Sequence, residues 1–582
     1  MLSPQQHHFY RLSAALSILT IHVALGSCIG LRPPGMLVDI HRRDGVFFAG
    51  MPASSPSANI DINIASTNST STTLAGTSGP NGWGAFVQPI DHDDLALGSF
   101  AQRFWYGTEH WRGPGSPILL ITPGEQSGTG FNDTYLTDQR IIGRFAAAVG
   151  AAVVILEHRY WGGSAPYVRL DGPRLRYLTV TNARRDLAAF ARGFVPPFDT
   201  SGRSSPATAP WILGGGSYAG ALAAWEAASD NHPFWAFYAT SAVVQSIGDF
   251  WQYFDTVRLA SPANCSADLV ATIAHVDEVL TSGSLSQKLD LKASFLLEDL
   301  EDADFANALT FGPLLWQQTQ FFSEAVLGYN SYHMFCNYIE NVWPNSTNPV
   351  PGPEGVGVFR ALDGYAKWFT QRVLPGLCQS LGYADFEGLY NTGCFANLNA
   401  SSPMYSDLLV DNPFSRQWSW LMCNEPLVWF QDASPTGQPS IISRLVSYDY
   451  NLAQCALMFP ASAGGFGLQH GRSPVDVNAA TGGWSVSPQR TPRLLYTNNE
   501  LDPWRPATVS ARTGRPGGPL ISTGDGDDKE PVRLIAGGGH CSDIYAANWA
   551  ANPGARAAAE EQAATLVRWV AEFYHNKGLV QP

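Results

Sequence analysis

The run Trp211–Gly220 constrains the fold more than any other, because an apolar stretch breaks at three glycines into Ser217 and a helix-like pattern follows. A serine hydroxyl becomes a useful nucleophile when a sharp strand-to-helix turn exposes it to a base, and only small neighbours let that turn form. Gly215 and Ala219 supply the small neighbours here, although the usual pattern G-x-S-x-G has glycine in place of Ala219. The segment predicts a nucleophile elbow, with a turn that serves only close packing as the alternative.

Two later segments supply the partners that a nucleophilic serine requires. A strand-like run at 493–497 leads to Asp502, and another at 532–536 leads into a glycine-rich loop that carries His540. The order serine, aspartate, histidine is that of α/β-hydrolases, in which histidine takes the serine proton and the acid orients the imidazole. Taken alone, Asp502 could be a turn-forming residue. Taken alone, His540 could be a loop histidine that hydrogen-bonds to the backbone. Together with Ser217 they predict a catalytic triad.

Apolar runs alternate with helix-like patterns along much of the chain. Apolar residues recur at helical spacing from Leu187 to Phe194, after a Thr181 cap, and from Leu566 to Phe573. The strand-like runs lie near 117–122, 151–156, 210–214, 493–497 and 532–536. This alternation predicts a mostly parallel sheet with helices on both faces. The expected fold class is therefore α/β, and the order of the triad makes it an α/β-hydrolase fold.

About half of the 582 residues lie between Ser217 and Asp502, far more than a minimal hydrolase core places there. This stretch is rich in helix-like segments and aromatic side chains, so we expect a large inserted helical cap. Ser, Thr, Asn, Gly and Pro dominate residues 51–83, which favours a flexible leader. The expected parts are a signal peptide at 1–27, a leader at 28–84, a hydrolase core at 85–254 and 461–582, and a cap at 255–460.

The N-terminus has the layout of a secretory signal. Arg11 precedes a short apolar stretch that runs to Leu25, with cleavage expected near Gly26 or Cys28. The stretch is shorter than the roughly 20 apolar residues of a membrane span. We therefore expect a secreted protein, or one delivered to a vacuolar or lysosomal lumen, without a stable membrane span. Sequons that would accept glycans in such a compartment lie at Asn68, Asn132, Asn264, Asn345 and Asn399.

The chain has eight cysteines and a formal net charge of −14, which indicate its redox compartment and its possible partners. Because Cys28 lies at the signal boundary, the remaining seven predict up to three disulfides and one leftover thiol in an oxidising compartment. Cys541, beside His540, is interpreted as a bridge candidate. The sequence has no C-x-x-C pair of the zinc-binding kind, and we expect neither a metal nor a cofactor. The negative charge argues against nucleic acid as a partner.

Several blocks together resemble the prolyl carboxypeptidase and dipeptidyl peptidase II family of serine peptidases. They are Gly215–Gly220, Asp502–Trp504, Gly538–Asp543, Glu157–Ser164 and, more weakly, a pair of motifs within Gln88–Phe104. The blocks recur in family order from about residue 85 to the C-terminus, and the tryptophan in the fourth is typical of fungal members. The resemblance implies a serine-type peptidase with a helical cap over its site and a preference for cleavage after proline.

Two backbone N–H donors are expected to face the developing oxyanion. Tyr218, directly after the nucleophile, supplies one by the logic of these hydrolases. A loop after an earlier strand supplies the other, and the family segment Gly-Gly-Glu or Gly-Asn-Glu corresponds here to Pro123–Glu125. We assign Gly124 to this role, while Glu125 could bind a substrate amine or cap the next helix. The block Glu157–Arg159 is interpreted as a hydrogen-bonded cluster beneath the site and is not assigned to catalysis.

An aromatic slot suits proline, because its ring is rigid and it has no N–H group to satisfy. The segment Arg416–Glu425 resembles a family block that approaches the cleft, and a tryptophan lies next to the orienting acid. Plain packing is the alternative for each of these side chains. The substrate-side candidates are Trp418, Trp420, Glu425 and Trp504.

The expected function is that of a secreted or vacuolar serine peptidase acting on proline-containing peptides or proteins. An acyl-enzyme would form at Ser217, with His540 as base and then acid. The triad does not distinguish a carboxypeptidase, a dipeptidyl peptidase and an endopeptidase, because the shape of the cap decides among them. Two alternatives remain: an esterase or lipase, although the sequence has no His-Gly-Gly-Gly oxyanion motif, and an inactive binding protein that kept the hydrolase fold.

Overall fold

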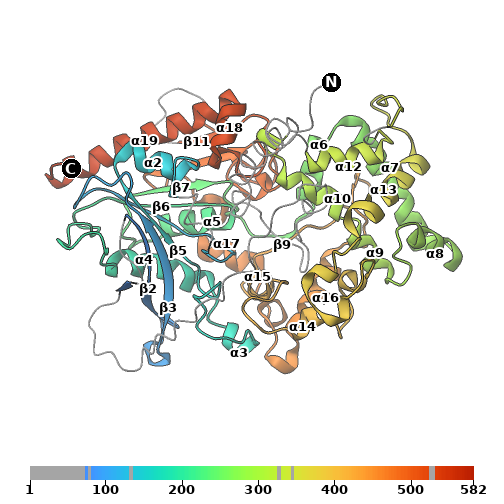
Figure 1. Ribbon diagram of the computed structural model, residues 1–582, viewed down its shortest axis with the longest axis horizontal. Coiled ribbons are helices and arrows are strands. Elements are labelled where there is room, and N and C mark those ends of the chain that lie inside the picture. The colour runs from blue at the N-terminus through green and yellow to red at the C-terminus, as the bar shows by residue number, and fades with distance from the viewer. Residues whose placement is uncertain (1–72, 76–79, 130–135, 324–329, 343–345, 523–530) are drawn as a thin grey trace, which may run out of the picture.

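The computed structural model describes residues 73–75, 80–129, 136–323, 330–342, 346–522 and 531–582. A nine-stranded sheet runs through it in the order β1-β2-β3-β5-β4-β6-β7-β10-β11 (Figure 1). The first three strands are antiparallel, and the other six are parallel to one another. Their bounds are β1 Thr73–Ala75, β2 Asn81–Pro89, β3 Ser99–Gly107, β4 Ile118–Ile121, β5 Ala152–Leu156, β6 Trp211–Gly216, β7 Ala236–Thr240, β10 Leu494–Asn499 and β11 Val532–Ile535.

The parallel half of the sheet consists largely of the strands that the sequence predicted. The runs near 117–122, 151–156, 210–214, 493–497 and 532–536 became β4, β5, β6, β10 and β11. β7 lies between β6 and β10 and was not predicted. β1 and β2 begin before residue 85, where the hydrolase core was expected to start. The predicted Thr181 cap was wrong: Thr179 accepts the Asn182 N–H and starts the helix two residues earlier.

Helices cover both faces of the sheet because alternate strand residues point to opposite sides. In β4, Leu119 and Ile121 pack with α2 and α19, whereas Ile118 and Leu120 pack with α4 and α5. The two helix pairs lie on opposite sides of the strands in Figure 1. The bounds of the core helices are α2 Ile141–Val149, α3 Gly172–Leu175, α4 Val180–Gly193, α5 Ser217–Ala227, α18 Ala546–Ala551 and α19 Pro553–Lys577.

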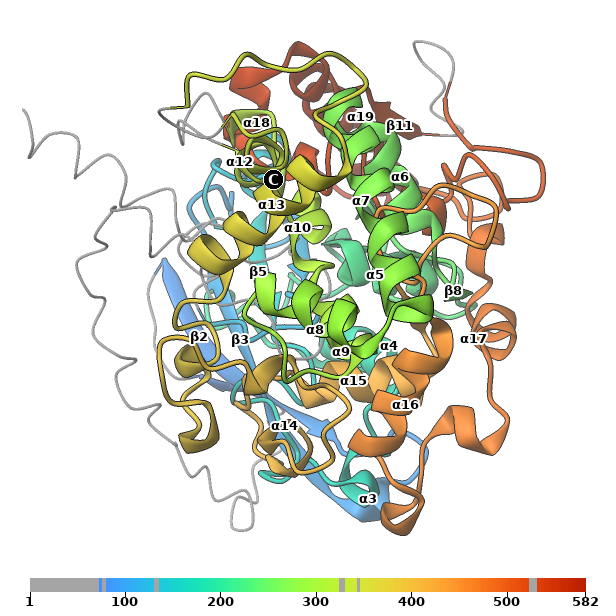
Figure 2. The ribbon, with the colours of Figure 1, turned by 90° about the vertical axis from the view of Figure 1, so that its right-hand side faces the viewer.

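The chain between β7 and β10 forms a mainly helical cap, which confirms the helical insertion of the predicted fold class. Figure 2 shows most of its helices in front of the sheet. A short parallel pair, β8 (Ile247–Asp249) and β9 (Val428–Phe430), accompanies them. The helices are α6 Gln252–Ala260, α7 Ala263–Ser282, α8 Leu285–Ser294, α9 Asp302–Ala308, α10 Phe311–Leu314, α12 Ser331–Ile339, α13 Val358–Trp368, α14 Pro403–Ser406, α15 Arg416–Cys423, α16 Tyr448–Met458 and α17 Pro474–Thr481.

Disulfides tie the cap together. They join Cys265 to Cys336, Cys378 to Cys394 and Cys423 to Cys455. Cys541 is also disulfide-bonded, which confirms its interpretation as a bridge candidate. The described residues contain no free cysteine, so the predicted leftover thiol was wrong. Within the described residues, no helix is long and apolar enough to cross a membrane.

Two of the predicted glycosylation acceptors fall within the described part of the chain. The side-chain amide of Asn264 donates to Glu340 Oε2 at 2.6 Å, a bond that uses the nitrogen to which a glycan would be attached. Asn399 is exposed, so access does not prevent its modification. The signal peptide, most of the leader, Asn68, Asn132 and Asn345 lie outside the described residues.

Candidate active site

Ser217 lies at a sharp turn between β6 and α5. It is the first residue of the helix, directly after Gly216 of the strand, and its φ is 57°. A positive φ costs a non-glycine residue about 1–3 kcal/mol, so the surrounding packing must hold it. A Cβ on Gly215 would lie 2.5 Å from carbonyl atoms of Ala219, and one on Gly220 would lie 2.9 Å from the Gly215 oxygen. Glycine at these two positions therefore permits the turn, and alanine at 219 fits beside them.

Asp502 and His540 form a buried pair at neighbouring strand ends. The imidazole Nδ1 lies 2.9 Å from Asp502 Oδ1 and 3.0 Å from Oδ2, and both residues are fully buried. Asp502 Oδ1 also accepts the backbone N–H of Trp504 at 2.9 Å, which fixes the carboxylate. A hydrogen bond from Nδ1 leaves Nε2 as the basic nitrogen. Nε2 of His540 is buried and has no hydrogen-bond partner among the described residues.

The sheet topology brings the three predicted triad residues to one edge. β6, β7, β10 and β11 are adjacent and parallel, so their carboxyl ends share that edge. Ser217 follows β6, while Asp502 and His540 follow β10 and β11. Ser241, just after β7, accepts a hydrogen bond from Cys541 N–H at 3.0 Å. The serine, acid and base segments are thus assembled around the end of a strand that the sequence did not predict.

The two predicted oxyanion donors lie in adjoining segments. Tyr218 is the second residue of α5, and N–H groups in a first helical turn have no acceptor within the helix. Gly124 has a φ of 73°, and a Cβ on it would lie 3.6 Å from Ala219 N and 3.7 Å from the Tyr218 ring. The Gly124 N–H makes a long contact of 3.4 Å with Thr122 Oγ1. The loop after β4 therefore covers the start of α5.

Burial controls the ionisation of the side chains around Tyr218. It raises the pKa of Glu125, on the loop after β4, to about 7. It lowers the pKa of His158 to about 4, so this histidine is neutral at pH 7. The His158 ring bonds Arg159 O through Nδ1 at 2.8 Å and the Tyr218 hydroxyl through Nε2 at 3.2 Å. The tyrosine that follows the candidate nucleophile is thereby anchored.

The block Glu157–Arg159 forms the hydrogen-bonded cluster that the sequence predicted. Glu157 is fully buried and pairs with Arg103 through contacts of 2.6 and 2.8 Å. Arg159 makes contacts of 2.6 and 2.7 Å with Asp186 on α4. A buried charge persists only when it is paired and hydrogen-bonded, and these contacts meet that condition. The cluster joins the antiparallel strands to α4 and the loop after β5.

Comparison with known proteins identifies the family. The model of a family described as serine carboxypeptidase S28 matches residues 88–560. The chain belongs to this serine carboxypeptidase S28 family. It is accordingly a serine-type peptidase, a hydrolase. That membership is in line with the relation to serine peptidases that the sequence blocks suggested.

Named relatives of the S28 chain include serine proteases of fungi and animals. It is 39% identical over 500 residues to "Serine protease vicPa" of Bipolaris victoriae (strain FI3), which covers 85% of this chain and 90% of the relative. It is 28% identical over 459 residues to "Thymus-specific serine protease" of Homo sapiens, covering 77% and 78% of the two chains. Among solved structures, a proline iminopeptidase of Mycobacterium smegmatis is similar at 11% identity and a TM-score of 0.29, covering 84% of this chain and 98% of that one.

The substrate-side candidates of the S28 chain occupy different positions. Trp418 contacts the Tyr218 ring at 5.3 Å between centroids, and Trp504 lies 6.3 Å from the His540 ring. Trp420 donates its indole N–H to Leu178 O at 3.1 Å. Glu425 accepts the Val180 N–H at 3.0 Å and an Arg472 N–H at 2.9 Å. Trp418 and Trp504 thus lie next to the candidate site, whereas Trp420 and Glu425 connect the cap to the segment around α4.

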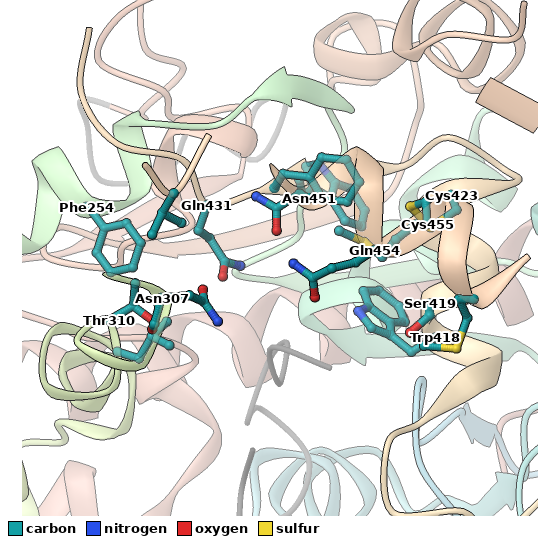
Figure 3. A pocket seen from close by; sticks show the side chains of 16 residues that line it. Phe254, Asn307, Thr310, Trp418, Ser419, Cys423, Gln431, Asn451, Gln454 and Cys455 are labelled. Atoms are coloured by element: carbon teal, nitrogen blue, oxygen red, sulfur yellow. A yellow bond between two sulfur atoms is a disulfide. The ribbon is translucent and has the colours of Figure 1, made fainter. Parts of the chain in front are cut away.

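A cavity in the cap adjoins these aromatic rings. Its lining includes Trp418 and Trp429, which stack with 6.4 Å between ring centroids (Figure 3). Trp429 in turn lies 6.3 Å from Trp504. A continuous set of rings therefore separates the cavity from Tyr218 on one side and His540 on the other. The cavity lies beside the candidate triad, which does not line it.

Sequence reasoning missed two residues of this region. Trp429 belongs to the short strand β9, whose isolated aromatic residues give no periodic signal. Gln320 lies between helices in the cap and donates its side-chain amide to His540 O at 2.8 Å. A single glutamine in a loop carries no sequence signal for such a contact, because the contact depends on how the cap meets the core.

Proposed function

We propose that this S28 peptidase is a secreted enzyme that hydrolyses peptide bonds on the carboxyl side of proline through an acyl-enzyme at Ser217. The observation that carries the proposal is the buried contact between His540 Nδ1 and Asp502, which leaves a basic Nε2 at the sheet edge where the elbow serine lies. The disulfides support an oxidising compartment. So does the name of a relative, "Probable extracellular serine carboxypeptidase" of Arthroderma benhamiae.

In the acylation step, Ser217 Oγ attacks the scissile carbonyl carbon while His540 Nε2 takes the hydroxyl proton. The negative charge of Asp502 stabilises the imidazolium that forms, and its position fixes the tautomer. The carbonyl oxygen becomes an oxyanion, and the N–H of Tyr218 with that of the Gly124 loop stabilises it. Loss of one such donor typically costs about 3–4 kcal/mol of barrier. The imidazolium then returns its proton to the leaving amine as the C–N bond breaks.

Deacylation repeats the same transfers with water. His540 removes a proton from the water, whose oxygen attacks the acyl carbon, and the proton passes to Ser217 as the ester bond breaks. The product is a new carboxylic acid, and the enzyme returns to its starting state. The triad, the backbone donors and water are sufficient for every proton transfer in the two steps.

The preference for proline rests on the family resemblance of the sequence blocks and on the aromatic surroundings. Trp418 and Trp504 offer apolar ring faces near the triad, and both are almost fully buried. Such faces suit a rigid ring that has no N–H to satisfy. The enzyme can act as a carboxypeptidase, a dipeptidyl peptidase or an endopeptidase. Which of these it is depends on whether the cap admits a free carboxyl end, a free amino end or the middle of a peptide chain.

The test is cleavage of proline-containing peptides with free and blocked ends by wild-type and Ser217→Ala protein, with products identified by mass. Post-proline products that disappear in the variant support the mechanism. Their lengths separate carboxypeptidase, dipeptidyl peptidase and endopeptidase action. Serine-dependent hydrolysis of esters without peptide cleavage would instead favour the esterase alternative.

A further inference from the structure

The cavity in the cap has a mixed lining of apolar and polar side chains, and none of them is ionisable. None of the 16 residues that line it is Asp, Glu, Lys, Arg or His. Four carboxamide side chains point toward its middle in Figure 3, and they come from α9, from the loop after β9 and from α16. They are Asn307, Gln431, Asn451 and Gln454. The cavity thus offers both hydrogen-bond donors and acceptors without a net charge.

Most of this hydrogen-bonding capacity is unused. The side-chain amides of Asn307, Gln431 and Gln454 make no hydrogen bond to other residues in the described part of the chain. Asn451 donates to Asp432 Oδ1 at 2.8 Å, so its amide oxygen is the group that it presents to the cavity. None of these amide atoms is enclosed by protein, so each can form hydrogen bonds with what occupies the cavity. A set of unpaired amides around one space is therefore suited to a ligand.

Two members of the lining are almost fully buried and lack partners. Gln454 and Trp418 are each 6% exposed. The indole N–H of Trp418 has no acceptor among the described residues. Cys423 and Cys455, which form a disulfide in the wall, hold α15 and α16, the helices that carry Trp418 and Gln454. These side chains are thus held in place; the Gln454 amide faces the cavity, whereas the Trp418 N–H is enclosed by protein and unpaired.

The cavity is close enough to the candidate triad to hold part of a bound peptide. Trp418 contacts Tyr218, which follows the nucleophile, at 5.3 Å between ring centroids. On the other side, Trp429 lies 6.3 Å from Trp504, and Trp504 lies 6.3 Å from His540. The Trp418 ring lies between the cavity and Tyr218, and the Trp429 and Trp504 rings lie between the cavity and His540. A substrate side chain that enters the cavity from the triad therefore has to pass beside these rings.

We propose that the cavity is a subsite for a glutamine or asparagine residue of the peptide substrate, an inference that rests on the proposed function. A carboxamide side chain presents one acceptor and two donors, which match the lining formed by Asn307, Gln431, Asn451 and Gln454. A charged side chain finds no counter-charge there and loses its hydration. An apolar side chain leaves the amide of Gln454 without a partner in the cavity, which is how sites built for hydrogen bonding reject analogues.

The test is a set of peptides that share one proline and differ at single positions on both sides of it. Each position carries in turn Gln, Glu, Lys or norleucine, and kcat/KM is measured with wild-type enzyme and with Ser217→Ala. We expect one position at which Gln is cleaved about 10- to 100-fold faster than Glu, Lys or norleucine. Equal rates for all four residues at every position would overturn the subsite and leave the proposed function intact. Absence of Ser217-dependent cleavage would overturn the proposed function itself.

A charge switch tests the assignment of the cavity. Gln454→Glu should move the preference at that position toward Lys by at least about 10-fold, because it supplies the missing counter-charge. Asn307→Asp, on a different helix, should shift it in the same direction, which keeps the test valid if one variant folds poorly. Gln379→Glu is the matched control, since Gln379 is exposed and does not line the cavity. An unchanged preference in folded Gln454→Glu and Asn307→Asp enzymes would contradict the proposal.

Discussion

Gln320 of the cap donates its side-chain amide to the main-chain carbonyl of His540 at 2.8 Å. The same side chain accepts hydrogen bonds through Oε1 from Ser542 Oγ at 3.0 Å and from Asn548 Nδ2 at 2.7 Å. All four residues are buried. The loop that carries the candidate base is therefore held by the cap on one side and by the core on the other. Cap and core together set the position of His540.

Replacement of Gln320 should change the rate more than it changes substrate binding. In Gln320→Met the side chain keeps its length but loses all three hydrogen bonds, and small displacements of reacting groups can cost about 100-fold in rate. We expect kcat to fall about 10- to 100-fold with little change in KM. Steady-state kinetics on a reference peptide measure both constants. Gln371→Met, at an exposed position, is the control, and equal kcat in both variants would contradict a positioning role for Gln320.

The charge of Asp502 should matter more than its volume. Asp502→Asn keeps the shape, but the amide favours the wrong imidazole tautomer, and comparable changes in serine proteases lower kcat about 10⁴-fold. We expect a loss of this size, with a melting temperature that stays within a few degrees of the wild-type value.

Asp543→Asn is the matched control, because Asp543 is also buried and its carboxylate accepts hydrogen bonds from Tyr238 and Thr240 at 2.5 Å. It should lower stability and leave most of kcat. A similar kcat in the two variants would argue against Asp502 as the orienting acid.

The sequence predicted the parallel half of the sheet because those strands are continuous apolar runs, as in strands buried on both faces. β7 escaped prediction although its residues are buried, since Ala236–Thr240 follows α5 closely and ends without a chemical motif. β2 contains Gly82 and Gly84, and glycines weaken a strand pattern. The Thr181 cap was misplaced because Thr179 offers an equivalent hydroxyl two residues earlier.

The common location of the three triad candidates at one sheet edge could be predicted, because each follows a strand of the parallel sheet. The surroundings of the site could not, since they depend on contacts between distant segments. Glu425 illustrates this: it lies in the predicted block, yet its carboxylate bonds Val180 N–H and Arg472. The carboxamides around the cavity come from three separate segments of the cap. No spacing in the sequence indicates that they converge.

Glu125 should make the activity depend on pH. Burial raises the pKa of this carboxyl to about 7, and it lies on the loop assigned to the oxyanion. Below that pH the group is neutral, whereas above it a negative charge opposes the oxyanion. We therefore expect kcat/KM to decline as the pH rises through 7, and we expect Glu125→Gln to retain more of its activity at pH 8. Rates measured from pH 5 to 9 test this.

Glu226 provides the control for that experiment. Burial raises its pKa to about 7 as well, but it lies near the end of α5, away from Ser217, and pairs with Arg184 at 3.3 Å. Glu226→Gln removes a carboxyl of similar pKa without changing the charge at the oxyanion. Its pH profile should follow that of the wild-type enzyme. Matching profiles for wild type and Glu125→Gln would show that the charge of Glu125 has no part in the decline.

Stability should fall with rising pH because of Asp432. Burial and the nearby Asp249 raise the pKa of this carboxyl to about 9. An unfolded aspartate has a pKa near 3.9, so the stabilisation from the bound proton is complete below about pH 4 and is lost as the pH rises toward 9. Each unit of difference is worth about 1.4 kcal/mol. Asp432→Asn has no proton to lose. Between pH 5 and 9 its melting temperature should therefore fall by roughly 2 °C or more less than that of the wild type.

Asp385→Asn, at an exposed position, should follow the wild-type curve. Parallel curves for wild type and Asp432→Asn in calorimetry would rule out this carboxyl as the source of the pH dependence.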